Sequence, residues 1–207
     1  CQPIKALSVG FEHTCLVQDG EALCFGGNQE GQCGDNPPVV GAPLSTMGAN
    51  LRPLPIDTEG GDVLGDVLGV VAGLRFTCAH TIDGRVACFG ENLLGQTGSG
   101  DPVVDTGGPV TDLAAGRSHV CALREDGSVV CWGENRLCQA GAGHSRPSVG
   151  TDPAEMGAAL VPVGLRPGRV TNLSAGEFFT CARFDSGDVQ CWGAAADGAL
   201  GQGDVVD

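Results

Sequence analysis

The sequence contains no tyrosine, two tryptophans and a single lysine, Lys5. Lysine and arginine together number 11 against 25 acidic residues, which gives a formal net charge of −14. This balance argues against a nucleic-acid-binding protein, because phosphates are neutralised mainly by lysine and arginine. An acidic chain favours basic or cationic partner surfaces instead. Apolar runs of the roughly 18–20 residues that a transmembrane helix needs are also absent, so we expect no membrane span.

The start of the chain lacks a methionine, and it lacks the basic segment and apolar run of a signal peptide. We therefore expect a processed or excerpted chain. Glycine and cysteine are abundant, with 35 and 11 residues, and hydrophobic residues make up 42%, enough for a folded core. Eleven cysteines are unusual for a reducing compartment, so they indicate either a protein outside the cytosol or a metal site, and their spacing has to decide.

Four similar segments make up most of the sequence. Each has a strand of small residues, a glycine, a cysteine, an Asp-Gly or Ser-Gly turn, a second cysteine, an aromatic residue and a glycine. This order is typical of a short strand followed by a β-hairpin. We predict four repeat units with their linkers, at 1–66, 67–109, 110–169 and 170–207.

Two linkers, 35–66 and 142–169, are long and rich in proline and glycine. We expect each of them to contribute one short edge strand. The remaining linker, 101–109, is short.

The two cysteines of each unit are spaced as a facing pair in a hairpin. They are ten residues apart in the last three units, where a three-residue turn places them opposite each other. They are nine apart in the first unit, where a two-residue Asp19-Gly20 turn restores the pair. This favours cross-strand disulfides over buried thiols or a zinc site. The predicted disulfides are Cys15–Cys24, Cys78–Cys88, Cys121–Cys131 and Cys181–Cys191.

Three cysteines, Cys1, Cys33 and Cys138, have no counterpart at a matched position. They can pair with each other, pair across chains or stay as thiols, and the odd total leaves at least one outside any disulfide within the chain. Cys1 is also a candidate for a lipid-modified N-terminus. Asn172 begins an Asn-Leu-Ser sequon and is a possible glycosylation site. We expect Ser174 to be buried, which disfavours occupancy.

The motif Ala-Gly-x-x-His-x-Cys-Ala-Leu-x-x-Asp-Gly-x-Val-x-Cys-Trp-Gly-x-Asn resembles the repeat of the regulator-of-chromosome-condensation family. Asn135 and the pair Gly95-Gln96 also fit, and the resemblance covers about 33 residues of each unit. It implies an all-β protein, a β-propeller whose blades are small antiparallel sheets, usually seven in a ring. Four units imply a partial or open ring, or part of a seven-bladed ring. The cysteine pairs resemble the secreted branch of the family.

The histidines of the repeat are candidate ligands or catalytic groups. His13 and His119 each precede a cysteine by two residues and share its strand face. A metal or catalytic role would need a third converging group, and none is evident, so we predict structural histidines bonded to backbone and no metal site. His80 and His144 stand at unmatched positions, and we expect both to be exposed.

Two further sets of residues recur with the repeat. The turn carboxylates match no calcium-binding loop, so we expect solvated turn residues at Asp35, Asp101, Asp105, Asp204 and Asp207. One aromatic residue follows each second cysteine, and we predict that these four pack between blades: Phe25, Phe89, Trp132 and Trp192.

We predict a non-enzymatic β-propeller, extracellular or at the cell surface, that contacts other proteins and needs no cofactor. The leading interpretation is a structural or assembly module, such as a surface-layer, appendage or filament component, whose protein partners include copies of itself. The alternative is a secreted inhibitor or receptor-like module that grips one protein partner through its loops. An enzyme is disfavoured, because no Gly-x-Ser-x-Gly elbow and no phosphate-binding loop occurs in the sequence.

Overall fold

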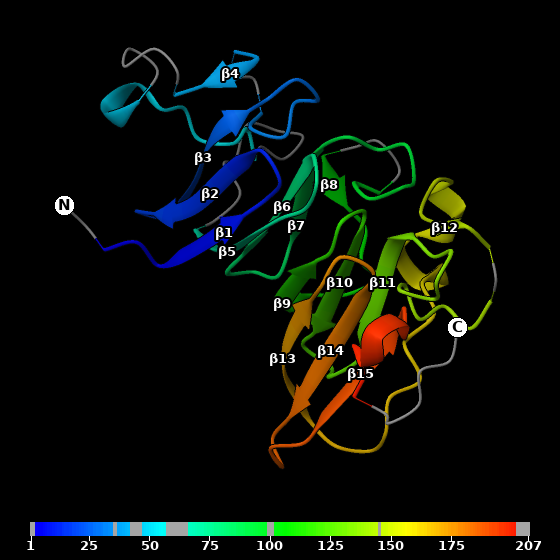
Figure 1. Ribbon diagram of the computed structural model, residues 1–207. Coiled ribbons are helices and arrows are strands. Elements are labelled where there is room, and N and C mark those ends of the chain that lie inside the picture. Colours follow the sequence, from blue (N-terminus) through cyan, green and yellow to red (C-terminus); the bar gives the residue numbers. More distant parts are fainter. Residues whose placement is uncertain are drawn as a thin grey trace.

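A computed structural model of the chain describes residues 3–34, 37–41, 47–56, 66–98, 102–144 and 146–201. Over these residues the fold is all-β, as predicted, with four antiparallel sheets and a few single turns of 3-10 helix. The sheets stand next to one another in an open arc (Figure 1). Within the described segments no helix is long and apolar enough to cross a bilayer.

Each repeat unit forms one sheet, numbered here in chain order. Sheet 1 contains β1 (Ala6–Val9), β2 (His13–Gln18), β3 (Glu21–Gly27) and β4 (Val39–Val40). Sheet 2 contains β5 (Val67–Ala72), β6 (Phe76–Thr81), β7 (Val86–Gly90) and β8 (Val103–Val104). Sheet 3 contains β9 (Val110–Ala115), β10 (His119–Arg124), β11 (Val129–Glu134) and β12 (Ser148–Val149). Sheet 4 contains β13 (Val170–Ala175), β14 (Phe179–Phe184) and β15 (Val189–Gly193).

The strands of each sheet follow one another in space as they do in sequence. The first strands are neighbours from sheet to sheet, β1 beside β5, β5 beside β9 and β9 beside β13. Figure 1 shows these four strands along the concave side of the arc. The 3-10 turns lie in the linkers and after the last strand: η2 (Gly48–Asn50), η3 (Pro153–Glu155), η4 (Gly157–Ala159) and η5 (Ala196–Gly198).

The hairpin register predicted from cysteine spacing is confirmed. Cys121 faces Cys131 with Leu123 opposite Val129, and the cysteines of the other three hairpins face each other in the same way. In sheet 1 the turn is Asp19-Gly20, with φ of 56° and 80°, a conformation that favours asparagine, aspartate and glycine. The registration is therefore kept although the turn length differs.

The two long linkers each supply an edge strand, as predicted, namely β4 and β12. The short linker also supplies one, β8, which the sequence did not predict. Its place differs, because β8 pairs with the start of the third strand whereas β4 and β12 pair with its end. In the long linkers a later segment covers that start instead, with Leu54 N donating to Ala22 O and Val163 N donating to Val129 O, both at 2.8 Å.

The hydrophobic core lies between sheets rather than within any one of them. One cluster of buried side chains joins sheets 1 and 2, and a second joins sheets 2, 3 and 4. Each sheet is thin, so it buries a face only where a neighbouring sheet covers it. The outward faces of sheets 1 and 4 have no such neighbour in the described structure (Figure 1).

Candidate functional site

The loops that follow the four first strands meet around the axis of the arc. Phe11 N donates to Gly73 O at 3.3 Å, and Leu74 N donates to Arg117 O at 2.9 Å. Arg117 N in turn donates to Glu177 O at 3.0 Å. These backbone bonds link the four sheets in succession and fix the spacing of the loop tips.

A glycine opens each of these loops because a ring lies where its side chain would be. A Cβ on Gly116 would overlap the imidazole of His119, and one on Gly73 would overlap the ring of Phe76. The same holds for Gly10 with His13 and for Gly176 with Phe179. The spacing Gly-x-x-ring is therefore a packing requirement of each sheet.

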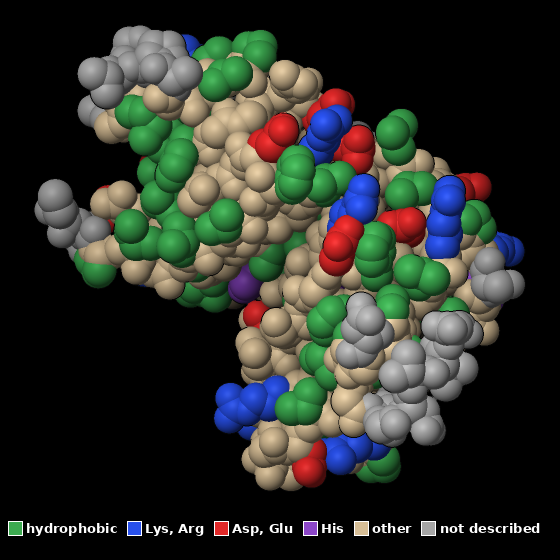
Figure 2. Space-filling view, in the orientation of Figure 1, with side chains coloured by type: hydrophobic (Ala, Val, Ile, Leu, Met, Phe, Trp, Pro, Cys, Tyr) green, Lys and Arg blue, Asp and Glu red, His purple; other side chains and the backbone are tan. Residues whose placement is uncertain are grey.

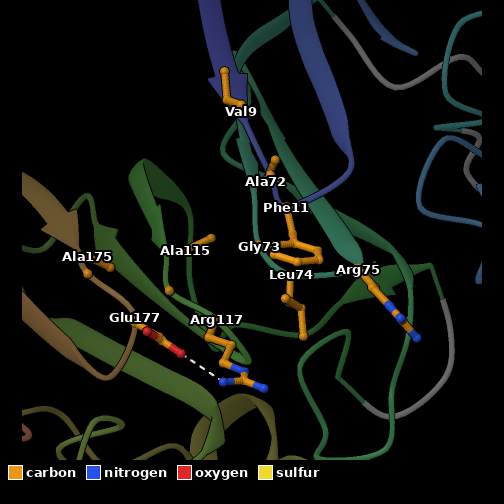
Figure 3. Close-up of a pocket in the computed structure, with 13 residues that line it drawn as sticks. Val9, Phe11, Ala72, Gly73, Leu74, Arg75, Ala115, Arg117, Ala175 and Glu177 are labelled. Carbon is orange, nitrogen blue, oxygen red and sulfur yellow. Dashed lines mark hydrogen bonds and ion pairs between the residues drawn. The ribbon is translucent and has the colours of Figure 1, made fainter. Parts of the chain in front are cut away.

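The loops surround a cavity of about 670 Å³ (Figure 3). It is lined by the ends of the first strands and by the loop residues that follow them. Phe11 on its rim is 70% exposed, and Leu74 on the adjacent loop also lines it. Beside sheets 1 and 2 the rim therefore carries two large apolar side chains, together with the guanidinium of Arg75.

The rim is charged beside sheets 3 and 4. Arg117 forms an ion pair with Glu177, with Nη1 2.7 Å from Oε1, and both side chains are about half exposed. The Arg117 guanidinium also lies over the ring of Phe178, 5.6 Å from its centroid. An exposed pair of this kind adds little stability, so it matters mainly for what the rim presents to solvent.

The two repeat histidines join adjacent sheets through side chains. His13 Nε2 and Thr77 Oγ1 share a hydrogen bond of 2.8 Å, and His119 Nε2 and Thr180 Oγ1 share another of 2.8 Å. The predicted structural role is thus correct, whereas the predicted backbone partner is wrong for Nε2. Single-sequence spacing could not reveal it, because the partner lies in the next repeat. Burial lowers the pKa of His119 to about 4 and also lowers the pKa of His13.

His80 is buried, contrary to the prediction, while His144 is exposed as predicted. The His80 ring occupies the space left by Gly69, where a Cβ would overlap the imidazole. Burial lowers the pKa of His80, and the negative charge of Asp112 partly opposes that shift. The glycine in the neighbouring strand was the available sequence signal for this burial.

The structure joins the four cysteine pairs expected from the spacing, with S–S distances of 2.05 to 2.07 Å. The disulfides of sheets 1, 2 and 3 lie on the face that points to the next sheet, and Cys181–Cys191 lies on the equivalent face of sheet 4. Cys15 and Cys24, for example, share a buried cluster with Ala79 and Ala87 of sheet 2. The first three disulfides are therefore part of the interfaces between sheets.

Of the four aromatic residues predicted to pack between blades, the two tryptophans each donate a hydrogen bond to the preceding repeat unit. Trp132 Nε1 donates to Gln96 O of sheet 2, and Trp192 Nε1 donates to Gln139 O of sheet 3, both at 3.1 Å. Trp132 is fully buried, and Phe25, Phe89 and Trp192 are partly buried. The packing role predicted for these residues is consistent with this arrangement.

The four disulfides do not include Cys33 or Cys138. Cys33 lies buried in the turn after β3, and burial raises the pKa of its thiol to about 12. Cys138 is exposed and has a φ of 60°, the left-handed conformation that Gly31 has in sheet 1. Cys1 lies outside the described residues.

Asn172 lies exposed on β13, and its Nδ2 donates to the Asp112 carboxylate at 3.1 Å. Ser174 is exposed, so the expectation that it is buried is wrong. Asp105 is an exposed turn residue whose Oδ1 accepts a hydrogen bond from Gly107 N at 2.9 Å. The other four predicted turn carboxylates lie outside the described residues: Asp35, Asp101, Asp204 and Asp207.

The outward faces of the two end sheets show what a covering sheet normally buries. Leu7 of sheet 1 is 63% exposed, whereas its counterparts are each 5% exposed: Val70, Leu113 and Leu173. Val189 of sheet 4 is 58% exposed, whereas residues at its position in sheets 1 to 3 are 1% exposed: Ala22, Val86 and Val129.

We call these surfaces the open face of sheet 1, which contains Leu7, Val9, Thr14 and Leu16, and the open face of sheet 4. The open face of sheet 4 contains Phe179, Val189 and the Cys181–Cys191 disulfide. Figure 2 shows hydrophobic side chains gathered over the sheet 1 end of the molecule, where β1 and β2 lie. Each open face is the counterpart of a face that is buried three times inside the chain.

Comparison with known proteins identifies the repeat. The model of the Regulator of chromosome condensation (RCC1) repeat matches residues 4–32, 110–137 and 170–202. The second unit is not matched, although it forms the same kind of sheet. No curated protein matches the sequence significantly.

Solved structures show the same fold at low identity. Prp20p from Saccharomyces cerevisiae, described with its binding to Gsp1p and histones, has a TM-score of 0.72 at 21% identity, over 98% of this chain and 48% of Prp20p. Human WBSCR16 has a TM-score of 0.60 at 19% identity, over 100% of this chain and 65% of that protein. The ectodomain of the Physcomitrella patens receptor kinase CR4 has a TM-score of 0.56 at 19% identity, over 95% of this chain and 44% of the ectodomain.

The chain thus spans about half the length of Prp20p. At these identities the similarity establishes the fold alone. Three of the four units thus match the RCC1 repeat, and the chain has the fold of an RCC1-like repeat β-propeller.

Proposed function

We propose that this chain is a non-enzymatic protein-interaction module of the extracellular space or the cell surface. It acts as a structural or assembly component, of the kind found in surface layers, appendages or filaments, and associates through the open faces of sheets 1 and 4. One observation carries the proposal: Leu7 is 63% exposed, while three residues at the same position in the other sheets are 5% exposed. A face built like three buried interfaces is suited to being covered.

The cysteines support the proposed location. Four disulfides in a chain of this size are typical of proteins that fold in oxidising surroundings. Each closes a short hairpin loop and contributes roughly 2–3 kcal/mol by the chain-entropy estimate. The module would lose this stabilisation in a reducing compartment.

The open faces supply a driving force for association. Covering a large aliphatic side chain contributes about 1.5–3 kcal/mol, and both Leu7 and Val9 are more than 60% exposed, at 63% and 69%. The net charge of −14 opposes contact between copies and favours basic partners. Salt screens that repulsion but leaves the apolar contact intact, so association between copies should strengthen as salt increases.

Sedimentation equilibrium of the full chain tests this function. We expect concentration-dependent association between micromolar and millimolar protein that increases with salt. Leu7→Glu and Val189→Glu should each weaken it, because each places a charge on an open face. Leu93→Glu is the matched control, since Leu93 is 81% exposed and lies outside both faces. A monomer at all concentrations, or equal weakening by Leu93→Glu, would contradict the proposal.

A second candidate is an inhibitor-like or receptor-like module that grips one protein through its loops. The exposed Phe11 and the neighbouring Leu74 at the rim of the cavity favour it. A photo-crosslinking side chain at position 11 should then capture one discrete protein in the native source, while the same group at position 93 should not. Capture of only further copies of this chain would favour the assembly role.

A further inference from the structure

Adjacent sheets pair two positions in a regular way. The ring position lies three residues after the loop glycine, and the facing position is the residue just before the first cysteine of the next sheet. His13 bonds Thr77 between sheets 1 and 2, and His119 bonds Thr180 between sheets 3 and 4, each at 2.8 Å. All four side chains are at most 3% exposed.

The interface between sheets 2 and 3 replaces both polar residues at once. Phe76 holds the ring position and Val120 the facing position, and both are fully buried in one core cluster. A polar ring therefore meets a hydroxyl group, whereas an apolar ring meets an aliphatic side chain. A mixed pair would bury a polar atom without a hydrogen-bond partner, which costs free energy.

The residue just after the first cysteine is restricted as well. In the three covered interfaces this residue is alanine, and it shares a core cluster with the disulfide of the preceding sheet: Ala79, Ala122 and Ala182. These alanines are 0–1% exposed, at 1%, 0% and 0%. A larger side chain would have to displace the disulfide or the strand that carries it.

The open face of sheet 4 has the features of the apolar interface. Phe179 holds its ring position, as Phe76 does in sheet 2, and the Cys181–Cys191 disulfide lies beside it on the same strand face. We propose that this face is a docking site for a further repeat sheet with an aliphatic residue just before its first cysteine and alanine just after it. The occupant follows from continuity with the interface in which Val120 and Ala122 cover the equivalent face.

The inference rests on the proposed function and adds that the residues on either side of the first cysteine of the incoming sheet determine which partner binds. A second copy of this chain does not meet the requirement, because the open face of sheet 1 presents Thr14 and Leu16. Head-to-tail contact would place Phe179 against a hydroxyl group and a leucine against the disulfide. Copies therefore associate weakly, and a sheet with the matched residues binds more tightly.

This selection is tested with full-length variants in which one of the two open faces is blocked by a charged residue. The receiver carries Leu7→Glu, so only its sheet 4 face can dock. Each probe carries Val189→Glu, so only its sheet 1 face can dock. One probe keeps Thr14 and Leu16 unchanged. The other probes carry Leu16→Ala, which removes the leucine side chain that would lie against the disulfide. The comparison is then between probes with Thr14 and probes with Thr14→Val.

We expect the Thr14→Val probe to bind the receiver about tenfold more tightly than the Thr14 probe, as measured by sedimentation velocity. A receiver that also carries Phe179→His should reverse that order. The probe with unchanged Thr14 and Leu16 should bind least. Equal affinity of all probes, or tightest binding by the unchanged probe, would overturn the proposal and make a second copy the occupant.

A double-mutant cycle at the interface of sheets 3 and 4 tests the pairing of ring and facing positions in the monomer, without any association between chains. His119→Phe and Thr180→Val should each lower the urea midpoint of unfolding, and the double variant should recover most of the loss. Additive losses would overturn the pairing rule. If the cycle shows coupling but neither wild type nor any probe associates, the proposed function fails while the rule for covered interfaces stands.

Discussion

The imidazole of His119 and the hydroxyl of Thr180 share a hydrogen bond of 2.8 Å across the boundary between sheets 3 and 4. Both side chains are fully buried. The bond shows that a residue at a repeat position of one sheet can find its hydrogen-bond partner in the next sheet. It also places an ionisable ring where protonation is costly, and burial holds its pKa at about 4.

The burial of His119 predicts acid sensitivity. An unfolded histidine takes up a proton below pH 6.5, whereas the folded ring stays neutral down to about pH 4. The unfolded state therefore binds more protons in this window, and the free energy of unfolding falls as the pH decreases through it. The buried His13 and His80, whose pKa values are also lowered by burial, act in the same direction.

Urea unfolding between pH 7 and pH 4 measures this effect. His119→Gln should be less stable at pH 7 and should lose less stability on acidification than wild type does. His144→Gln is the control, because His144 is exposed, and it should keep the wild-type slope. An unchanged slope for His119→Gln would show that other groups govern the acid response.

The glycine before each ring should not tolerate a methyl group. In Gly116→Ala the new Cβ would overlap the His119 ring and approach Gly176 O, so we expect a loss of about 1–3 kcal/mol in thermal or urea unfolding. Gly164→Ala is the matched control, since Gly164 is exposed and its Cβ would meet no atom within 4 Å. Its effect should stay within about 0.5 kcal/mol. Equal effects of the two substitutions would contradict this packing argument.

The disulfides should differ in their access to reductant. The cysteines of the first three pairs are 0–3% exposed, whereas Cys181 and Cys191 are half-buried on the open face of sheet 4. Under native conditions a mild phosphine reductant should therefore open Cys181–Cys191 first. Timed alkylation followed by peptide mapping reports the order, and mapping without reductant checks all four pairs. Earlier reduction of Cys121–Cys131 would contradict the assigned interfaces.

The two tryptophans should respond differently to a quencher and to replacement. Trp132 is fully buried and Trp192 is partly buried, so Trp192→Phe should leave fluorescence that acrylamide quenches weakly. Trp132→Phe should leave fluorescence that is quenched more strongly. It should also cost about 1–3 kcal/mol, because the buried Gln96 carbonyl loses the indole donor. Equal quenching of the two variants would contradict the burial of Trp132.

Local patterns were sufficient to predict the hairpins and their register. Cys121 faces Cys131 because turn length and strand pairing are set within a dozen residues, and the repeat supplies four versions of the same constraint. The all-β propeller class was expected from the resemblance of the repeat motif to a known family. The edge strand β8 was missed because a two-residue strand in a short linker carries almost no local signal.

Contacts between repeats were not predictable in the same way. His80 was expected to be exposed because its position has no histidine counterpart in the other units, yet its ring is buried in the space left by Gly69. The bond from His13 to Thr77 spans 64 residues and depends on how two sheets stack. Each is a property of the interface, which forms only when adjacent sheets pack.

The sequence by itself determined the repeat, the hairpin pairs and the acidic character, because these depend on spacing and composition. Only the tertiary structure decided which face of each sheet is covered. Leu7 and Leu173 occupy the same place in their sheets, and the first is 63% exposed while the second is 5% exposed. The difference arises because burial in a repeat protein depends on the neighbouring unit rather than on the residue itself.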